Sequence, residues 1–217
     1  MTSTRPEFQF YGRRKGKPLR RHHVELMDIL LPHLAVDLSQ PLANTQPRRW
    51  LEIGFGGGEH LAHQGALHPD VSVIGAEAFL NGVAKALAHI EEQKLSNVRI
   101  HYGDARALLK MLPDASIERL FLLYPDPWPK DRQKRRRFVN AENLSQFQRI
   151  LVPGGDFLFA SDIPDYIDWT LEHVAGHGGF ELVRQSPEPY DNWIQTRYEA
   201  KALREGRVPC YLTFRKR

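Results

Sequence analysis

The stretch at residues 120–139 reads LFLLYPDPWPKDRQKRRRFV, and the rest of the chain is interpreted outward from it. Its first five residues form a continuous apolar run, which is typical of a strand buried on both faces of a parallel sheet. Prolines at positions 125, 127 and 129 lack a backbone N–H and restrict the residue before them, so the chain must leave the sheet after Tyr124. Asp126 and Trp128 are therefore predicted on a stiff loop at the carboxyl end of a strand, where open α/β sheets bind ligands.

A basic run follows this loop. Six of the eight residues at 130–137 are Lys or Arg, which gives the run a net charge of +5, and residues 1–21 carry +6. Because the whole chain has a net charge of +4, the remainder is acidic at −7. Two basic segments on an otherwise acidic protein indicate a polyphosphate partner, although either run alone also fits an ordinary solvated surface. We predict a nucleic-acid partner and a basic, partly flexible N-terminal arm at residues 1–23.

Length and composition predict one globular domain at residues 24–217, behind this arm. The 217 residues suffice for one buried core and are few for two, and the hydrophobic and charged shares of 41% and 26% are ordinary for a globular protein. No apolar run approaches the roughly 20 residues of a membrane span, and the N-terminus lacks the apolar core of a secretory signal. Cys210 is the only cysteine, which excludes an internal disulfide and favours a reducing cytoplasm.

A second informative segment, residues 49–60, reads RWLEIGFGGGEH. A short apolar strand leads into a glycine-rich turn and then into a helix from about Glu59, and the glycines permit close approach of a ligand to the backbone. The dinucleotide fingerprint would need a glycine where Glu59 stands. Carboxylates at Glu52 and Glu59 suit a cofactor with a cationic end, such as S-adenosylmethionine, better than a pyrophosphate. A tight structural turn explains the glycines about equally well.

Further carboxylates follow the next two predicted strands. The strand at 71–76 ends at Glu77, about 20 residues past the turn, where an acidic group for ribose hydroxyls belongs. Asp104 closely follows the strand at 98–102, where it can accept a hydrogen bond from an adenine amino group. Either residue alone fits a helix cap or a turn. Together with Glu52, they place acids at three successive strand ends, which favours a bound donor.

Strands and helices alternate along the chain, which predicts an α/β fold with a seven-stranded, mostly parallel sheet and helices on both faces. The predicted strands are 50–53, 71–76, 98–102, 120–124, 156–160, 180–184 and 210–215. The predicted helices are 24–38, 81–93, 140–151, 164–175 and 196–205, with another from about residue 59. Residues 39–47 are predicted to be a linker and residues 152–155 a turn. The scattered histidines lack further ligands at useful spacing, so no metal site is predicted.

Three motifs together resemble those of the bacterial tRNA (guanine-N7-)-methyltransferases. They are EIGFG at 52–56, YPDPWPK at 124–130 with its basic tail, and TRYE at 196–199. The likeness covers nearly the whole chain from Arg13, including GRRKG at 12–16 in the arm. The resemblance implies a Rossmann-like class I methyltransferase fold, S-adenosylmethionine as donor, and methylation of guanine 46 in the variable loop of tRNA to give 7-methylguanosine.

The resemblance also assigns site residues by position. Asp126 is the catalytic carboxylate. The implied donor-binding residues are Glu52, Gly54, Gly56, Glu77, Asp104 and Asp126. The implied substrate-binding residues are Lys130, Asp162, Thr196, Arg197, Tyr198 and Glu199. The implied RNA-contacting residues are Arg132, Lys134, Arg135, Arg136 and Arg137.

The chemistry of this transfer sets what the site must do. Guanine N7 has an in-plane lone pair and no proton at neutral pH, so the enzyme's work is positioning and charge stabilisation rather than proton removal. Asp126 is expected to face the positive charge that develops on the purine, and Asp162 to accept from the Watson–Crick edge. Trp128 or Tyr198 is a candidate to stack on the base. Packing beneath the proline loop fits Trp128 equally well, and packing is slightly preferred for Tyr198.

Three alternatives stay open at this point. The same fold also serves methyltransferases that act on another RNA base or on a protein side chain. A non-catalytic tRNA-binding module would keep the fold but fail to bind S-adenosylmethionine. An NAD-dependent dehydrogenase is disfavoured by Glu59. A monomer or homodimer without an obligate protein partner is expected.

Overall fold

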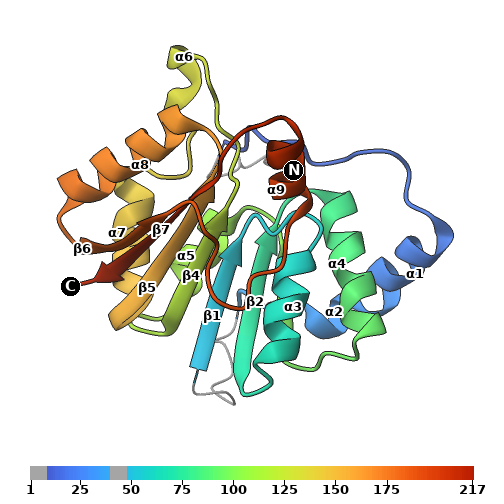
Figure 1. Ribbon diagram of the computed structural model, residues 1–217. Coiled ribbons are helices and arrows are strands. Elements are labelled where there is room, and N and C mark those ends of the chain that lie inside the picture. Colours follow the sequence, from blue (N-terminus) through green and yellow to red (C-terminus); the bar gives the residue numbers. More distant parts are fainter. Residues whose placement is uncertain (1–8, 40–47) are drawn as a thin grey trace, which may run out of the picture.

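The computed structural model describes residues 9–39 and 48–217, and Figure 1 shows a twisted sheet flanked by helices. Within these residues the sheet has seven strands in the order β3-β2-β1-β4-β5-β7-β6. The strands are β1 (Arg48–Ile53), β2 (Val71–Glu77), β3 (Val98–Tyr102), β4 (Ile117–Leu123), β5 (Leu151–Ser161), β6 (Phe180–Ser186) and β7 (Cys210–Lys216). Strands β1 to β5 pair in parallel, and β7 runs antiparallel to both β5 and β6. The predicted mostly parallel seven-stranded sheet is confirmed.

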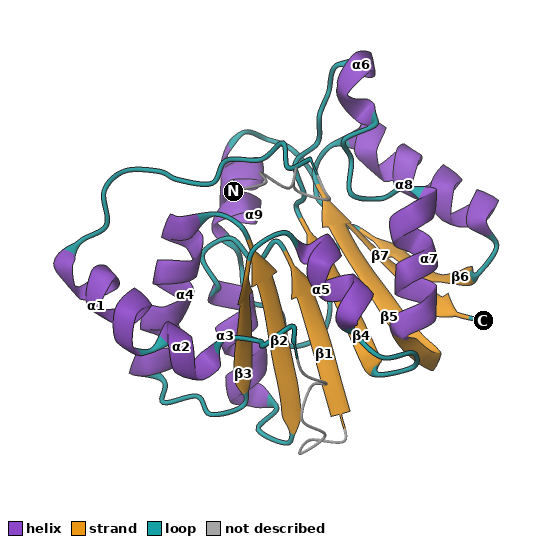
Figure 2. Ribbon diagram, turned by 180° about the vertical axis from the view of Figure 1, so that it is seen from behind, coloured by secondary structure: helices purple, strands orange, loops and turns teal. Residues whose placement is uncertain are grey.

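Helices cover both faces of the sheet, as predicted. They are α1 (Arg21–Ile29), α2 (Leu31–Leu34), α3 (Glu59–Leu67), α4 (Leu80–Glu92), α5 (Ala105–Met111), α6 (Asp131–Lys134), α7 (Ala141–Ile150), α8 (Pro164–His177) and α9 (Arg197–Arg204). Figure 2 shows α5, α7 and α8 in front of one face. Side chains alternate along each strand, so Leu51 packs in the core layer beneath those helices while its neighbour Trp50 packs in the layer beneath α1, α3 and α4. The sheet therefore separates two hydrophobic layers.

The central strands are apolar on both faces because both faces are covered. In β4, each residue from Leu120 to Leu123 is at most 7% exposed. In the edge strand β6, by contrast, Phe180 is the one buried residue. A continuous apolar run is thus the signature of the middle of this sheet, and it identified β4 correctly.

Two predicted elements differ from the structure, and two helices were missed. The predicted helix at 24–38 is two helices, because Pro32 in the first turn of α2 lacks the N–H that would continue α1. The predicted turn at 152–155 lies inside β5, where Gly154 has a φ of 74° and the register with β4 shifts. Helices α5 and α6 were not predicted. Residues 1–8 of the predicted arm and 40–47 of the predicted linker lie outside the described residues.

The order of the strands determines where a ligand can bind. Strand β1 pairs with β2 on one side and with β4 on the other, so the connections from β1 and from β4 lead to opposite sides of the sheet. In open α/β sheets this switch in direction leaves a crevice at the carboxyl ends of the strands. The carboxyl ends of β1, β2 and β4 lie at the upper edge of the sheet in Figure 1.

Candidate active site

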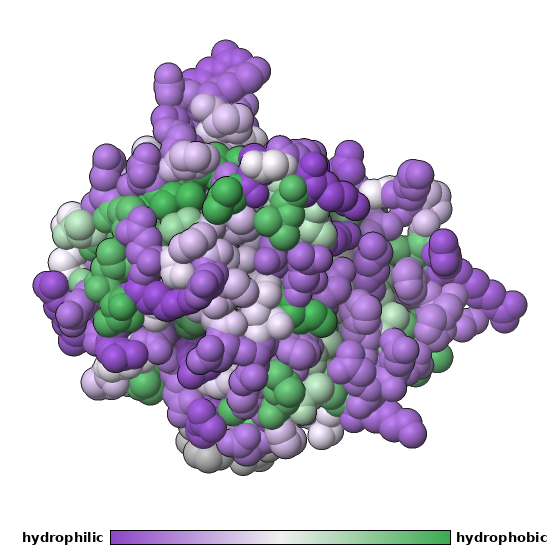
Figure 3. Space-filling view, in the orientation of Figure 1, coloured by the Kyte–Doolittle hydropathy of each residue, from purple (hydrophilic) through white to green (hydrophobic). Residues whose placement is uncertain are grey.

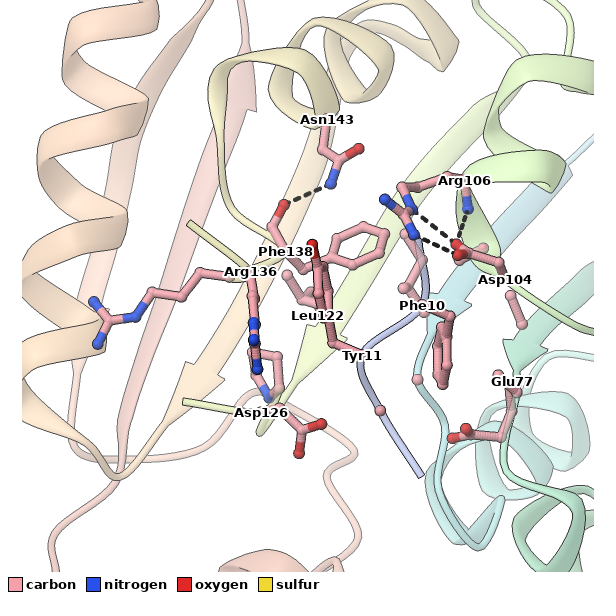
Figure 4. Close-up of a pocket in the computed structure, with 18 of the residues that line it drawn as sticks. Phe10, Tyr11, Glu77, Asp104, Arg106, Leu122, Asp126, Arg136, Phe138 and Asn143 are labelled. Atoms are coloured by element: carbon pink, nitrogen blue, oxygen red, sulfur yellow. Dashed lines mark hydrogen bonds and ion pairs between the residues drawn. The ribbon is translucent and has the colours of Figure 1, made fainter. Parts of the chain in front are cut away.

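A cavity of about 390 Å³ opens at this edge of the sheet (Figure 4). Ile53 at the end of β1 and Leu122 in β4 contribute apolar wall. Glu77, Asp104 and Asp126 also line it, so the structure brings together three of the four acids predicted to bind the donor. Parallel strands explain this grouping, because their carboxyl ends meet at one edge.

The glycine-rich turn forms one side of the cavity. Gly54, Gly56 and Gly58 have φ values of 71°, 58° and 80°, a region that favours glycine. A Cβ placed on Gly54 would meet nothing within 4 Å, so this face of the turn is open to a ligand. On the other side, a Cβ on Gly82 of α4 would lie 2.2 Å from the carbonyl oxygen of Gly56. Helix α4 can therefore pack directly against the turn only because residue 82 is glycine.

Glu77 is fixed against this turn. Its Oε2 accepts a hydrogen bond from the Gly56 backbone N–H at 2.8 Å, and its Oε1 accepts from the Phe79 N–H at 2.9 Å. Burial raises the pKa of Glu77 above its ordinary value, because desolvation outweighs these hydrogen bonds. The carboxylate is thus held rigidly at the pocket wall while retaining acceptor capacity for a ligand.

Asp104 serves as a helix cap as well as a pocket residue. It accepts the backbone N–H of Arg106 at 3.0 Å as the N-cap of α5, and it pairs with the Arg106 guanidinium at 2.6 Å. Burial alone would raise the pKa of Asp104, but the hydrogen bonds from Arg106 outweigh burial and lower it. The two interpretations of Asp104 from sequence, cap and site, are therefore compatible.

Asp126 differs from the other pocket acids in its lack of a hydrogen-bond partner among residues 9–39 and 48–217. It is exposed on the pocket wall, and within the described residues no group donates a hydrogen bond to its carboxylate. Desolvation by the surrounding protein nevertheless raises the pKa of Asp126 above its ordinary value. The flanking Tyr124 and Trp128 have φ values of 50° and 43°, so the loop that carries Asp126 turns sharply out of β4.

Glu52, the fourth predicted donor-binding acid, lies behind the pocket rather than on its wall. It is 2% exposed, and its Oε2 shares a hydrogen bond of 2.9 Å with Nδ1 of His60. The His60 ring packs on Phe121 and Trp193 at centroid distances of 4.9 and 5.2 Å. In this structure Glu52 therefore secures the start of α3 to the sheet.

The predicted substrate segment at 196–199 divides between pocket and core. Tyr198 lines the pocket and is 45% exposed. The Arg197 guanidinium lies 4.9 Å from the Tyr198 ring centroid, and a Cβ on Gly56 would come within 3.0 Å of the Tyr198 ring. These two side chains thus lie against the glycine-rich turn.

The other two residues of the segment hold α9 in place. Thr196 caps the helix by accepting the Glu199 backbone N–H at 3.2 Å. Glu199 is 6% exposed, and its two carboxylate oxygens accept from Trp193 Nε1 at 2.6 Å and from the Tyr211 hydroxyl at 2.7 Å. The Tyr211 hydroxyl in turn lies 3.2 Å from that of Tyr124, at the end of β4.

Lys130 and Asp162 do not line the cavity. Lys130 is exposed at the N-cap of α6. Asp162 follows β5 and accepts a hydrogen bond of 2.5 Å from Arg207 Nε, in the connection between α9 and β7. The structure therefore does not bring these two residues together with Asp126.

The basic run surrounds one rim of the cavity. Helix α6 projects from the body of the molecule in Figure 1, and the same projection is hydrophilic in Figure 3. Arg132 is exposed, and Arg135 and Arg136 line the pocket. Lys134 instead forms an ion pair with Asp165 at 2.7 Å. Arg137 also borders the pocket, but it departs from the expectation of an RNA contact, because it is 1% exposed and its guanidinium binds Pro127 and Asp165.

The N-terminal arm supplies pocket residues that the sequence analysis missed. Residues 9–13 line the cavity, and Figure 4 shows the Phe10 ring projecting between Glu77 and Asp104. Arg106 donates to the Gln9 carbonyl oxygen at 3.0 Å. The Arg136 guanidinium lies 4.4 Å from the Tyr11 ring centroid and 4.9 Å from that of Trp128. In the sequence, the aromatic residues that lie among the arginines of the arm are the signal that could have predicted this wall of the cavity.

The described residues form neither a metal-binding cluster nor a membrane-spanning helix. Among residues 9–39 and 48–217, no three His, Cys, Asp or Glu side chains gather closely enough to hold a metal ion. In the same part of the chain, no helix is long and apolar enough to cross a membrane.

Comparisons with known proteins identify the family. The family described as "Putative methyltransferase" matches residues 46–211. The tRNA (guanine-N(7)-)-methyltransferase of Agrobacterium fabrum is 51% identical over 96% of this chain and 95% of its own length, and that of Paracoccus denitrificans is 48% identical over 98% and 96%. The crystal structure of the 16S rRNA methyltransferase KamB superposes with a TM-score of 0.60 at 18% identity over 94% of this chain and 98% of its own, which shows a Rossmann-like methyltransferase fold. With this identity over nearly its whole length, the chain belongs to the family of tRNA (guanine-N7-)-methyltransferases.

Proposed function

We propose that this chain transfers the methyl group of S-adenosylmethionine to N7 of guanine 46 in the variable loop of tRNA. Full-length similarity to tRNA (guanine-N7-)-methyltransferases supports the reaction and the substrate. The observation that carries the proposal in the structure is Asp126, a carboxylate on the wall of the cavity to which no described residue donates a hydrogen bond. It lies between acids suited to the donor and a rim of arginines suited to RNA.

The residues of the cavity fit the donor. The open face of Gly54 is a cradle that a Cβ would fill, and it leaves the backbone accessible. We assign Glu77 to the ribose hydroxyls and Asp104 to the adenine amino group, and their place on the cavity wall at the ends of β2 and β3 supports this. When bound, S-adenosylmethionine supplies an activated methyl group on a cationic sulfonium. Glu52 contributes from behind by fixing α3, rather than from the wall.

The chain's own residues then orient the base and stabilise charge. Asp126 faces the positive charge that develops on the purine, an interaction that is strong where protein excludes water. Desolvation by the surrounding protein raises the pKa of Asp126, which supports such an environment. Tyr198 is the ring better placed to stack on the base, because it lines the pocket and is 45% exposed, and stacking contributes about 1–3 kcal/mol. Trp128 is already packed against Arg136.

The tRNA is held by positive charge around the cavity. Arg132 and Arg135 are exposed on the rim, and the arm carries further arginines and lysines along α4, where Asn81 Nδ2 donates to the Lys17 carbonyl at 2.7 Å. Such phosphate contacts make affinity fall steeply with salt. Lys130 and Asp162 are proposed to reach the substrate when tRNA binds. We place the protein in the cytoplasm as a monomer or homodimer.

The direct test is to incubate the protein with labelled S-adenosylmethionine and an unmodified tRNA transcript and to map the methylated atom. The matched control is the same transcript with adenine at position 46. We expect label at N7 of guanine 46 and none in the control. Label on another base would assign a different acceptor, and failure to bind S-adenosylmethionine would favour a non-catalytic tRNA-binding module.

A further inference from the structure

Arg137 is set apart from the rest of the basic run by its burial. Its side chain is 0% exposed, whereas Arg132 and Arg135 are exposed. A guanidinium stays charged at any pH that a protein tolerates, and burying it without partners costs several kcal/mol. Its N–H donors must therefore be used inside the protein.

The contacts of Arg137 join the proline loop to α8. Its Nε donates to the Pro127 carbonyl oxygen at 2.9 Å, and its Nη1 donates to the Asp165 carbonyl oxygen at 3.1 Å. Its Nη2 forms an ion pair with the Asp165 carboxylate. The guanidinium also packs on the rings of Tyr166 and Trp169, with centroid distances of 4.8 and 5.0 Å. Both Asp165 and the two rings belong to α8, so Arg137 fastens the loop to a rigid element.

Apart from the packing of Trp128 against Arg136 and Tyr11, at 4.9 and 6.3 Å to the ring centroid, few contacts hold the loop. Its three prolines donate no hydrogen bond, and among the described residues the Arg137 Nε–H donates the only hydrogen bond that residues 125–129 receive. Trp128 has a φ of 43°, a conformation that the surrounding structure must maintain. Pro127, whose carbonyl is held, is the neighbour of Asp126. The bond from Arg137 therefore fixes the peptide unit between Pro127 and Trp128, one residue past the pocket carboxylate.

We propose that Arg137 is a positioning residue for methyl transfer, which holds Asp126 in place through the Pro127 carbonyl with Asp165 as its counter-charge. The part concerning transfer rests on the proposed function. Asp126 has no hydrogen bond of its own within the described residues, so its direction depends on the backbone that carries it. Misplacement of a reacting group by about 1 Å can lower a rate about 100-fold.

The test compares Arg137→Met with Arg149→Met. Arg137→Met keeps an apolar side chain of similar length but removes the guanidinium and its hydrogen bonds. Arg149 is a matched control because it also donates to carbonyl oxygens, at 2.7 Å to both Leu109 and Leu112, but it lies in α7 outside the cavity. The first readout is amide hydrogen exchange over residues 124–131 of the ligand-free protein. We expect faster exchange in Arg137→Met and unchanged exchange in Arg149→Met.

The second readout is the single-turnover rate of tRNA methylation at saturating donor and tRNA, expressed per donor-binding site. We expect a fall of about 10- to 100-fold for Arg137→Met, with the tRNA Kd and its salt dependence unchanged. Arg149→Met should lose stability but keep its rate per donor-binding site. Asp165→Asn is the milder variant to use if Arg137→Met fails to fold, because the Asp165 side chain is 51% exposed. It should also speed exchange in the loop and lower the methylation rate, but by smaller factors.

Two results would overturn the proposal. One is unchanged exchange and rate in Arg137→Met. The other is a drop of about 1 in the slope of log affinity against log salt, which would make Arg137 an RNA contact instead. If the wild-type protein methylates no tRNA, the proposed function fails, while the exchange comparison still decides whether Arg137 holds the loop.

Discussion

Replacing Glu199 distinguishes a substrate contact from a structural anchor. The two carboxylate oxygens of Glu199 accept hydrogen bonds from Trp193 and Tyr211, at 2.6 and 2.7 Å, in a site that is 6% exposed. Glu199→Ala removes both acceptors and leaves two buried donors without partners. Hydrogen bonds to a charged acceptor are worth about 1.5–3 kcal/mol each, so the loss of two should lower the free energy of unfolding by about 3–6 kcal/mol.

Glu199→Gln should lower the free energy of unfolding much less, because the hydrogen bonds to Trp193 and Tyr211 can rearrange around an amide. The amide oxygen accepts from Trp193, and the amide N–H donates to the Tyr211 oxygen. The Tyr211 hydroxyl proton is then free to turn toward the Tyr124 oxygen, which lies 3.2 Å away. Only the contribution of the negative charge is lost, so we expect a cost of about 1 kcal/mol.

Urea unfolding of the two variants measures this difference, and tRNA methylation assigns the role. Glu92→Ala, at an exposed position at the end of α4, is the control and should change stability by less than about 0.5 kcal/mol. An anchor predicts that Glu199→Gln keeps its methyl-transfer rate. Equal stability losses for Ala and Gln would refute the network argument, and a stable but inactive Glu199→Gln would make Glu199 a substrate contact.

Three further predictions concern the pocket. Phe10→Ala should weaken S-adenosylmethionine binding several-fold in calorimetry, because the ring lines the cavity; equal or tighter binding would mean that the ring obstructs the donor. Gly82→Ala should displace the Gly56 carbonyl, costing about 1–3 kcal/mol of stability and weakening donor binding, whereas Gly176→Ala, where a Cβ meets nothing within 4 Å, should not. Asp126→Asn should raise the melting temperature slightly at pH 8, because the raised pKa of Asp126 shows that its charged form is disfavoured in the folded state. That gain in melting temperature should shrink as the pH falls toward 3.8, the ordinary pKa of the group, because the wild-type carboxylate then becomes protonated in the folded and the unfolded chain alike. A gain that grew on acidification would contradict the raised pKa.

The parts of the fold that sequence predicts best are those with strong local patterns. The apolar run before Pro125 identified β4, and the spacing of the later strands gave a mostly parallel sheet that the structure confirms. Asp104 was recognised at a strand end, but the short helix α5 that it caps was not, because seven residues carry too little periodicity. Pro32 was overlooked as a break between α1 and α2.

The site was less predictable, because the charge of a residue does not determine where its side chain points. The six basic residues at 130–137 appear equivalent in sequence, yet Arg137 is buried against α8 while Arg135 is exposed at the rim of the pocket. Likewise, Glu52 and Glu77 both lie at strand ends in the sequence pattern. Only Glu77 faces the cavity, because the Glu52 carboxylate forms a hydrogen bond with His60. Such partners lie far apart in sequence or on opposite faces of an element, where spacing gives no signal.

The central claim is that methyl transfer takes place beside Asp126 in this cavity. The measurement that tests it most directly is the rate of methyl transfer to tRNA by Asp126→Asn, with tRNA affinity determined in parallel. Asp131→Asn is the control, because Asp131 lies in the same basic run with its side chain 96% exposed. We predict that Asp126→Asn binds tRNA normally and transfers no methyl group, while Asp131→Asn remains active. Wild-type turnover by Asp126→Asn would contradict the account.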